Sequence, residues 1–238
     1  MIAAIVYSNR PGQFNKFKEH PFHQKMKIIQ ISDAKNISEA YQRIPEYKEE
    51  LKGYDKIVLT HDDVFFKSDL VDSEPLIDGL LLHSEKDTLI GLAGSKRFDA
   101  RICIYWWNYL GSLTGTVDHA KYNKDGSLKR WSNSYGPFDH VVNIGEKYLW
   151  YSKAKVIDGL FILAKKDYLV NRNPFRNSRG NHFYDIRASL NTPRVLVMDF
   201  RVEHFGLGDS MQSNDYVQEG KRLLVDSKSG VFPEHYNI

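Results

Sequence analysis

Apolar runs rich in branched residues recur along the first 95 residues, and polar turns or segments with helical spacing separate them. Residues 1–8, MIAAIVYS, are one such run, and 26–32, 55–63 and 88–95 contain similar ones. Continuous apolar runs of this length are typical of strands that are buried on both faces, as in parallel sheets. The alternation therefore predicts an α/β fold with a mostly parallel, doubly wound sheet.

The segments between these runs carry helix and loop signals. Asn36 followed by Glu39 is a capping box, and apolar residues follow at helical spacing as far as Ile44. Residues 73–85 also have a helical pattern. Residues 8–14, SNRPGQF, contain Asn, Pro and Gly, and this composition predicts a loop.

The rest of the chain has a different organisation. Residues 98–151 are rich in Trp, Tyr, Gly, Asn and Ser, and predict short antiparallel strands and loops in an irregular layer over the sheet. Residues 155–169 predict a buried strand and the start of a helix, and residues 181–191 predict a helix. Residues 194–208 predict one long strand, and the tail after Ser210 contains a polar helix.

Charge and cysteine content narrow the classes of function. The chain has 238 residues, of which 33 are basic and 30 acidic, without a basic block; this argues against a nucleic-acid partner. The single cysteine, Cys103, excludes an intramolecular disulfide framework and a thiolate cluster, and its apolar neighbours suit a core residue. The chain has no apolar segment of about 20 residues and no secretory signal, so we expect a soluble, cytoplasmic protein.

Polar side chains stand where three of the predicted strands end. They are Ser8–Asn9–Arg10, His61–Asp62–Asp63 and His204. In open α/β sheets, ligands bind outside the carboxyl ends of the strands. Because side chains alternate along an extended backbone, His61 and Asp63 are expected on one side and Asp62 on the other.

Each candidate residue has a functional and a structural interpretation. A carboxylate at a strand end suits Mg²⁺, and a nearby histidine shifts the preference towards Mn²⁺; an acidic pair also caps helices and begins turns. His204 is either a core histidine or a ligand at the rim of the sheet. Asp185 either offsets a helix dipole or takes a proton from an attacking hydroxyl. Asp158 and Gly159 form either an ordinary turn or a place where a ligand approaches the backbone.

Six segments, taken in order, resemble the glycosyltransferase family-two-like proteins of prokaryotes, which are associated with capsule and surface polysaccharide synthesis. The segments are IVYSNR, KIVLTHDDVFF, LIGLAGS, VIDGLFILAKKDYL, FYDIRASL and VLVMDFRVEHFGLGDS. The resemblance implies a GT-A fold in one continuous domain. Residues 1–97 would be the nucleotide-sugar-binding half, 98–210 the acceptor-binding half and 211–238 a C-terminal tail.

The resemblance also implies site residues. Asp63 stands where an Asp-any-Asp motif has its metal-binding carboxylate, His204 matches a late metal-binding histidine, and Asp185 matches the base of inverting members. Contacts to the nucleotide-sugar are implied for Ser8, Asn9, Arg10, His61 and Asp62, and contacts to the donor sugar or acceptor for Asp158 and Gly159. The sequence departs from the motif at His61, where the family has its first aspartate.

The implied activity is transfer of a sugar from a nucleotide-sugar donor to a saccharide or lipid-linked acceptor, assisted by Mn²⁺ or Mg²⁺. A bound cation would stabilise the nucleoside diphosphate leaving group. A lipid-linked acceptor would bring the protein to the inner face of the membrane. The aromatic residues of the middle segment either stack on an acceptor sugar or pack in the irregular layer; they include Trp106, Trp107, Trp131 and Trp150.

Two other functions use the same residues. A metal-dependent phosphoester hydrolase or nucleotidyltransferase would need a second cluster of ligands about 4 Å from the first metal. A non-catalytic nucleotide-sugar-binding protein would keep ligand affinity after the loss of Asp185.

Overall fold

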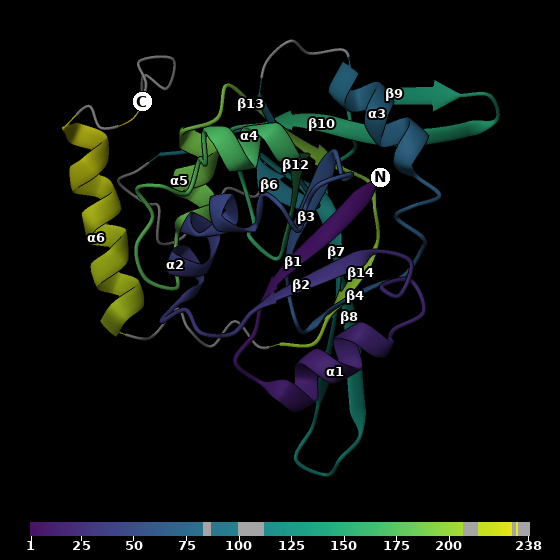
Figure 1. The fold of residues 1–238 in the computed structure, drawn as a ribbon, viewed down its shortest axis with the longest axis horizontal. Helices are drawn as coiled ribbons and strands as arrows, with labels where there is room; N and C mark the ends of the chain where they lie inside the picture. The colour runs from purple at the N-terminus through teal and green to yellow at the C-terminus, as the bar shows by residue number, and fades with distance from the viewer. Residues whose placement is uncertain (83–86, 100–111, 207–213, 230–231, 233–238) are drawn as a thin grey trace.

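The computed structural model describes residues 1–82, 87–99, 112–206, 214–229 and 232. Within these ranges the chain forms six α-helices and two β-sheets (Figure 1). The predicted α/β class is therefore confirmed. Among the helices of these ranges, none is both long and apolar enough to cross a lipid bilayer.

The first sheet has eight strands in the order β2-β1-β3-β12-β5-β13-β10-β9. Their bounds are β1 Ile2–Tyr7, β2 Lys27–Ile31, β3 Lys56–His61, β5 Thr88–Gly91, β9 His140–Ile144, β10 Lys147–Ala154, β12 Phe161–Lys165 and β13 Arg194–Met198. Strands β1, β2 and β3 pair in parallel, as do β5 and β13, whereas β12 runs antiparallel between β3 and β5, and β10 runs antiparallel between β13 and β9. The carboxyl ends of β1 and β3 therefore lie side by side. The prediction of a mostly parallel sheet is wrong: four of the seven described pairings in this sheet are antiparallel, because β12 and the β9–β10 hairpin join it in the opposite direction.

The second sheet has the order β11-β6-β7-β14-β4, and β8 pairs with β7. Its strands are β4 Val64–Phe66, β6 Ala93–Ser95, β7 Leu113–Tyr122, β8 Leu128–Tyr135, β11 Val156–Ile157 and β14 Val202–His204. The pairs β7–β8 and β9–β10 are antiparallel hairpins, as predicted for the middle of the chain. Cys103, Trp106 and Trp107 lie outside the described residues.

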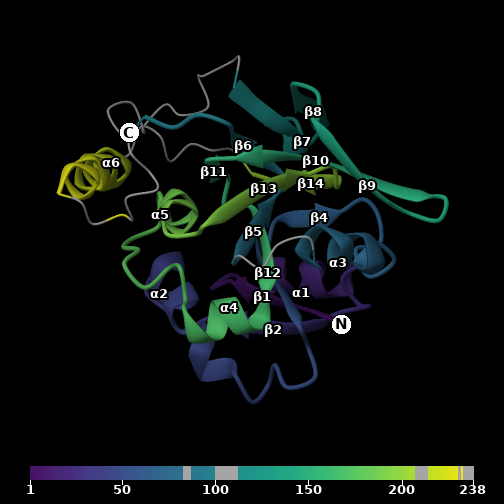
Figure 2. The same cartoon turned by 90° about the horizontal axis from the view of Figure 1, so that it is seen from above.

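The helices and the second sheet cover the two faces of the first sheet (Figures 1 and 2). The helices are α1 Pro11–Glu19, α2 Ile37–Gln42, α3 Glu74–Leu82, α4 Lys166–Asn171, α5 Tyr184–Leu190 and α6 Asn214–Lys228, with a 3₁₀ turn at Ile44–Tyr47. Successive residues of β1 alternate between two cores: Ala3 packs with α2 and α4, and Ala4 packs with α3 and the second sheet. The side chain of Asn36 accepts a hydrogen bond from the backbone N–H of Glu39, which confirms the predicted cap.

The prediction of a loop at residues 8–14 is wrong from Pro11 onward, because helix α1 begins there. Proline is favoured in the first turn of a helix, where its missing N–H has no acceptor to lose. Phe14 and Phe17 lie one turn apart and are both buried. The burial of Phe14 and Phe17 therefore stabilises this helix, although the Asn-Pro-Gly composition predicts a loop.

Two predicted strands are each divided between the sheets. Residues 88–95 form β5 in the first sheet and β6 in the second, and the described residues 194–206 of the other run form β13 and β14 rather than one long strand. A Cβ atom added at Gly91 would lie 2.8 Å from the Cβ of Ile157, so a glycine permits the close packing at the first of these bends. These crossings connect the two sheets and bring β14 beside β4.

Candidate metal centre and adjoining cavity

Three potential metal ligands converge where the two sheets meet. His61 ends β3, Asp63 follows it, and His204 ends β14; one ligand atom from each lies within 4.8 Å of the others. Oδ1 of Asp63 is buried without a hydrogen-bond partner among the described residues and lies 3.5 Å from Nε2 of His204. An unpartnered buried carboxylate oxygen is costly unless a cation or donor satisfies it, so this donor set fits a divalent ion.

Strand pairing explains why residues distant in sequence meet here. β4 pairs antiparallel with β14, which places Val64 opposite His204, and the backbone N–H of Phe205 donates to the carbonyl of Asp63 at 2.8 Å. A Cβ atom at Gly206 would lie 2.8 Å from Nε2 of His204. The glycine therefore leaves room for the imidazole beside the carboxylate.

A hydrogen-bond chain determines which nitrogen of His61 is free. Nε2 of His61 lies 2.7 Å from the hydroxyl of Tyr184, which donates its own proton to the carbonyl of Gly159 at 3.0 Å. The hydroxyl must therefore accept the Nε2 proton of a neutral His61, and Nδ1 keeps its lone pair for a ligand. A Cβ atom at Gly159 would lie 2.2 Å from the Tyr184 oxygen, so the glycine is needed for this contact.

Asp62 points away from this cluster, as the strand alternation predicts, and has a different role. Its carboxylate accepts hydrogen bonds from Ser8 and, at two atoms, from the guanidinium of Arg10. Ser8 and Asp62 are buried, and Asn9 is exposed. These hydrogen bonds of Asp62 hold the loop after β1 in place. The guanidinium of Arg10 also donates to Oδ2 of Asp63 at 3.2 Å.

The charges around Asp63 favour its ionised form. Burial opposes ionisation, but the neighbouring imidazoles of His204 and His61 and the guanidinium of Arg10 outweigh it, and the pKa of Asp63 falls to about 2. The carboxylate is therefore available as an anionic ligand throughout the neutral range.

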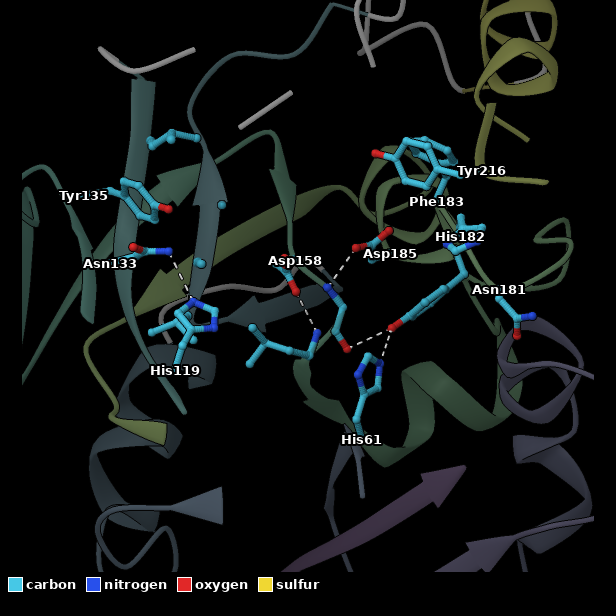
Figure 3. Close-up of a pocket in the computed structure, with 17 residues that line it drawn as sticks. His61, His119, Asn133, Tyr135, Asp158, Asn181, His182, Phe183, Asp185 and Tyr216 are labelled. Carbon is cyan, nitrogen blue, oxygen red and sulfur yellow. Dashed lines mark hydrogen bonds between the residues drawn. The ribbon is translucent and has the colours of Figure 1, made fainter. Parts of the chain in front are cut away.

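A cavity of about 550 Å³ adjoins the candidate metal centre (Figure 3). His61 lies on its wall, and the side chains of Asp158 and Asp185 flank the backbone of Gly159. Polar residues from several elements complete the lining; they include His119, Asn133, Tyr135, Asn181 and His182. The structure thus brings Asp158, Gly159 and Asp185 to one cavity with His61.

Asp185 lies in the first turn of α5, where both sequence interpretations apply. Its Oδ1 accepts from the N–H of Ile186 and its Oδ2 from the N–H of Gly159, each at 2.8 Å. Burial and the nearby charge of Asp158 raise the pKa of Asp185 to about 7. A carboxylate with that pKa, oriented by two hydrogen bonds in a cavity, is suited to proton transfer at neutral pH. Asp158 accepts from the N–H of Leu160 at 2.9 Å, which is a turn interaction.

His119 is a site residue that the sequence did not reveal. It pairs with His204 on neighbouring strands, its ring centroid lies 5.6 Å from that of His204, and it stacks on Trp131 at 5.2 Å. It lies in the strand β7, within the part of the chain for which the sequence predicts short antiparallel strands and loops. Trp150 is 41% exposed and is not part of the cavity lining. Trp131, in contrast, contacts the cavity wall through His119.

The described residues define an α/β protein with a candidate divalent-metal centre beside a cavity. No protein-family model matches the chain, and no curated protein matches it. Two solved structures have a similar backbone path. The first is "A197 from STIV", with a TM-score of 0.48 and 11% identity, over 87% of this chain and 86% of that chain. The second is a protein from Bacillus anthracis described provisionally as a glucose-1-phosphate thymidylyltransferase in complex with sucrose, with a TM-score of 0.34 and 12% identity, over 94% of this chain and 76% of that chain. Likenesses at this level carry no argument about activity, so the functional argument depends on the site.

Proposed function

We propose that this protein is a metal-dependent glycosyltransferase that moves a sugar from a nucleotide-sugar donor to a saccharide or lipid-linked acceptor. The observation that carries the proposal is the position of His61, Asp63 and His204, whose ligand atoms lie within 4.8 Å of one another beside the cavity that contains Asp185. Such a reaction needs a cation near the leaving group and a base near the attacking hydroxyl, and the two groups supply them.

Two imidazoles and one carboxylate would hold the ion. This donor set suits Mn²⁺ better than Mg²⁺, which prefers oxygen ligands alone. The unpartnered oxygen of Asp63 and the free Nδ1 of His61 are the atoms that the ion would satisfy. When bound, a divalent cation stabilises the negative charge that develops on a diphosphate leaving group.

Asp185 would act as the general base. In an inverting transfer, the acceptor hydroxyl oxygen forms a bond to the anomeric carbon while the bond from that carbon to the diphosphate oxygen breaks, and the hydroxyl proton passes to the carboxylate. Asp185 and the backbone of Gly159 lie on the wall of this cavity, whose volume of about 550 Å³ is large enough for a sugar. A positioned base with a pKa near the working pH contributes about 10²–10⁴-fold to such a step.

We also propose a GT-A-like division of labour between the sheets. Parallel strands β1 and β3 end at the candidate metal centre, which supports a donor side within residues 1–97. Strand β7 and its partner β8 contribute His119, Asn133 and Tyr135 to the cavity, which supports an acceptor side within residues 98–210.

The alternative of a two-metal phosphoester hydrolase or nucleotidyltransferase is less well supported. That chemistry needs two ions about 4 Å apart and enough ligands for both. In the part of the chain that the structure describes, His61, Asp63 and His204 are the one group of three or more His, Cys, Asp or Glu residues with ligand geometry. Asp62, the nearest further carboxylate in sequence, is engaged by Arg10 and Ser8.

The test is a thermal-shift screen of nucleoside diphosphates and nucleotide-sugars with and without Mn²⁺, followed by measurement of nucleoside diphosphate release. We expect stabilisation by one nucleoside diphosphate that requires Mn²⁺, and release from the matching nucleotide-sugar. Asp185→Asn should keep the stabilisation and lose release.

Asp167→Asn is the matched control for that variant, because Asp167 holds the equivalent place in the first turn of α4 and is exposed. Absence of any Mn²⁺-dependent stabilisation, or full release by Asp185→Asn, would contradict the proposal. Binding without release in the unaltered protein would indicate a non-catalytic binding protein.

A further inference from the structure

A second cavity, of about 770 Å³, borders the segment that carries Asp63. It lies between α1, β4 and the ends of β7 and β14, and is lined by Gln13, Lys16, His20, Phe65, Ala120, Lys121, Tyr122, Glu203, Phe205 and Gly206. Glu203 in β14 and Phe205 just after it flank His204 in sequence, and both line this cavity and not the first one.

Two lining residues, Gln13 and Gly206, place this cavity beside the candidate metal centre. The side chain of Gln13 donates to the backbone carbonyl of Asp62 at 3.0 Å. A Cβ atom at Gly206 would lie 3.4 Å from Oδ2 of Asp63 and 2.8 Å from Nε2 of His204. A ligand in the second cavity that extends past Gly206 would therefore meet an ion bound to Asp63.

Three aromatic side chains form one wall of the second cavity. The rings of Phe65 and Phe205 meet edge to face at 5.4 Å, and the ring of Tyr122 lies 6.4 Å from that of Phe205. Tyr122 is 69% exposed, which core packing does not explain. Flat aromatic faces at the mouth of a cavity suit stacking with a ring of a ligand.

The charged groups of the cavity favour an anion. Lys16 and Lys121 form no ion pair within the described residues, whereas the acidic Glu203 is engaged by Arg130 at 2.7 Å. Nδ1 of His20 is buried and has no hydrogen-bond partner in the part of the chain that is described. The cavity thus combines two uncompensated cations with an aromatic wall and borders a candidate metal centre.

The loop after β1 is poorly placed to bind a nucleotide in place of this cavity. Ser8 is 2% exposed and its hydroxyl is bound to Asp62, which also engages the guanidinium of Arg10. A nucleotide that bound through Ser8 and Arg10 would have to break these contacts and leave Asp62 buried without partners.

We propose that the second cavity binds the nucleoside diphosphate part of the donor. The base stacks on Phe205 and its aromatic neighbours, Lys16 and Lys121 neutralise the phosphates, and the diphosphate extends past Gly206 to the ion. The sugar then lies in the first cavity with Asp185. This inference rests on the proposed function, because it assumes a nucleotide-sugar donor.

The test is calorimetric titration with nucleoside diphosphates and with inorganic pyrophosphate, both in the presence of Mn²⁺. Replacing both Lys16 and Lys121 with Ala should weaken both ligands about tenfold or more, because both lysines neutralise phosphate. Phe205→Ala should weaken the nucleoside diphosphate about tenfold and leave pyrophosphate unchanged, since pyrophosphate has no ring to stack. Lys18→Ala is the matched control: Lys18 is an exposed lysine on the same helix and lies over the ring of Phe14.

Unchanged nucleoside diphosphate binding in the double lysine variant and in Phe205→Ala would overturn the inference, as would a loss confined to Ser8→Ala. The lysine variants alter partly or fully exposed side chains, so a folded protein is available even if Phe205→Ala does not fold. If these variants keep both turnover and nucleoside diphosphate binding, the second cavity is not the binding site, but the proposed transferase activity stands. If the variants lose binding as expected but the unaltered protein has no turnover, the binding site is supported and the proposed transferase activity is refuted.

Discussion

Oδ1 of Asp63 lies 3.5 Å from Nε2 of His204, and the two atoms form no hydrogen bond. Two atoms that bind one ion at about 2.1 Å lie roughly 3.0–3.4 Å apart, depending on the angle between the bonds. The pair therefore needs little movement to accept a cation. The backbone pairing of β4 with β14 maintains this separation before any ion is bound.

Removing either ligand should abolish tight Mn²⁺ binding. Losing a residue that merely orients a ligand lowers metal affinity about 10–100-fold, so we expect Asp63→Asn and His204→Ala to lower it at least about 100-fold. Titration of Mn²⁺ followed by electron paramagnetic resonance measures the affinity. Asp72→Asn, an exposed carboxylate on a neighbouring segment, should bind Mn²⁺ as the unaltered protein does. Equal affinity in Asp63→Asn would contradict the assignment.

Tyr184→Phe should lower Mn²⁺ affinity by about tenfold without changing a ligand. The variant removes the acceptor that keeps the proton of His61 on Nε2, so Nδ1 is no longer held free for the ion. In the metal-free protein, the ¹⁵N chemical shifts of His61 report the tautomer directly. They should show that Nε2 carries the proton in the unaltered protein, and that this preference is lost in Tyr184→Phe.

The matched control for this change is Tyr168→Phe, which removes another buried tyrosine hydroxyl, one bound to Thr192 at 2.7 Å. Gly159→Ala should mimic Tyr184→Phe, because the added methyl group would displace the tyrosine hydroxyl. A mixture of tautomers in the unaltered protein would show that the hydrogen-bond chain does not determine the proton's position.

The turnover of the proposed transferase should increase with pH through about 7. Asp185 accepts a proton only as a carboxylate, and its pKa is raised to about 7, so the active form is minor at pH 6 and dominant at pH 8. Asp185→Asn should lower turnover about 10²–10⁴-fold and abolish the rise. Initial rates of nucleoside diphosphate release between pH 6 and 8 provide the measurement, and a flat profile in the unaltered protein would exclude Asp185 as the base.

Acid should destabilise the fold through His23. This residue is fully buried; its Nδ1 donates to the carbonyl of Phe17 at 2.8 Å and its Nε2 accepts from the N–H of Phe66 at 3.2 Å, so both contacts require the neutral ring. Burial lowers the pKa of His23 from 6.5 to about 4. The stabilising contribution is therefore complete above pH 6.5 and is lost as the pH falls towards 4, by about 3 kcal/mol in all.

Urea unfolding at pH 7.5, 5.5 and 4.5 tests this dependence. His23→Gln should be less stable at pH 7.5 but should lose less stability on acidification. His140→Gln, at an exposed position on β9, should follow the unaltered protein at every pH. An identical pH dependence in His23→Gln would assign the acid sensitivity to other groups.

Local signals in the sequence were sufficient for much of the architecture. Uninterrupted apolar runs predicted β1, β2 and β3 because a strand buried on both faces has no polar side. The cap at Asn36 was predictable because it depends on two residues three positions apart. The strand breaks before β6 and β14 were missed, since both halves of each run are buried and a change of sheet leaves the apolar pattern intact.

Most of the candidate site residues that were predicted stand at strand ends, and Asp185 was predicted near a helix start. Asp63 and His204 were found from their places at strand ends, and the alternation of His61, Asp62 and Asp63 was predicted correctly. His119 and Tyr184 were not, because their importance depends on pairing with His204 and on reaching His61 across the fold. No local pattern around either residue contains that information.

His61 and Asp63 extend from the end of a strand in one sheet, whereas His204 ends a strand in the other. An ion held by all three would cross-link the two layers, so occupancy and the cohesion of the layers would be thermodynamically linked. At an ion concentration 100 times the dissociation constant, that linkage amounts to about 2.7 kcal/mol of added stability. Amide hydrogens of β4 and β14 should then exchange more slowly when the ion is bound, while those of the distant edge strand β9 should be little affected.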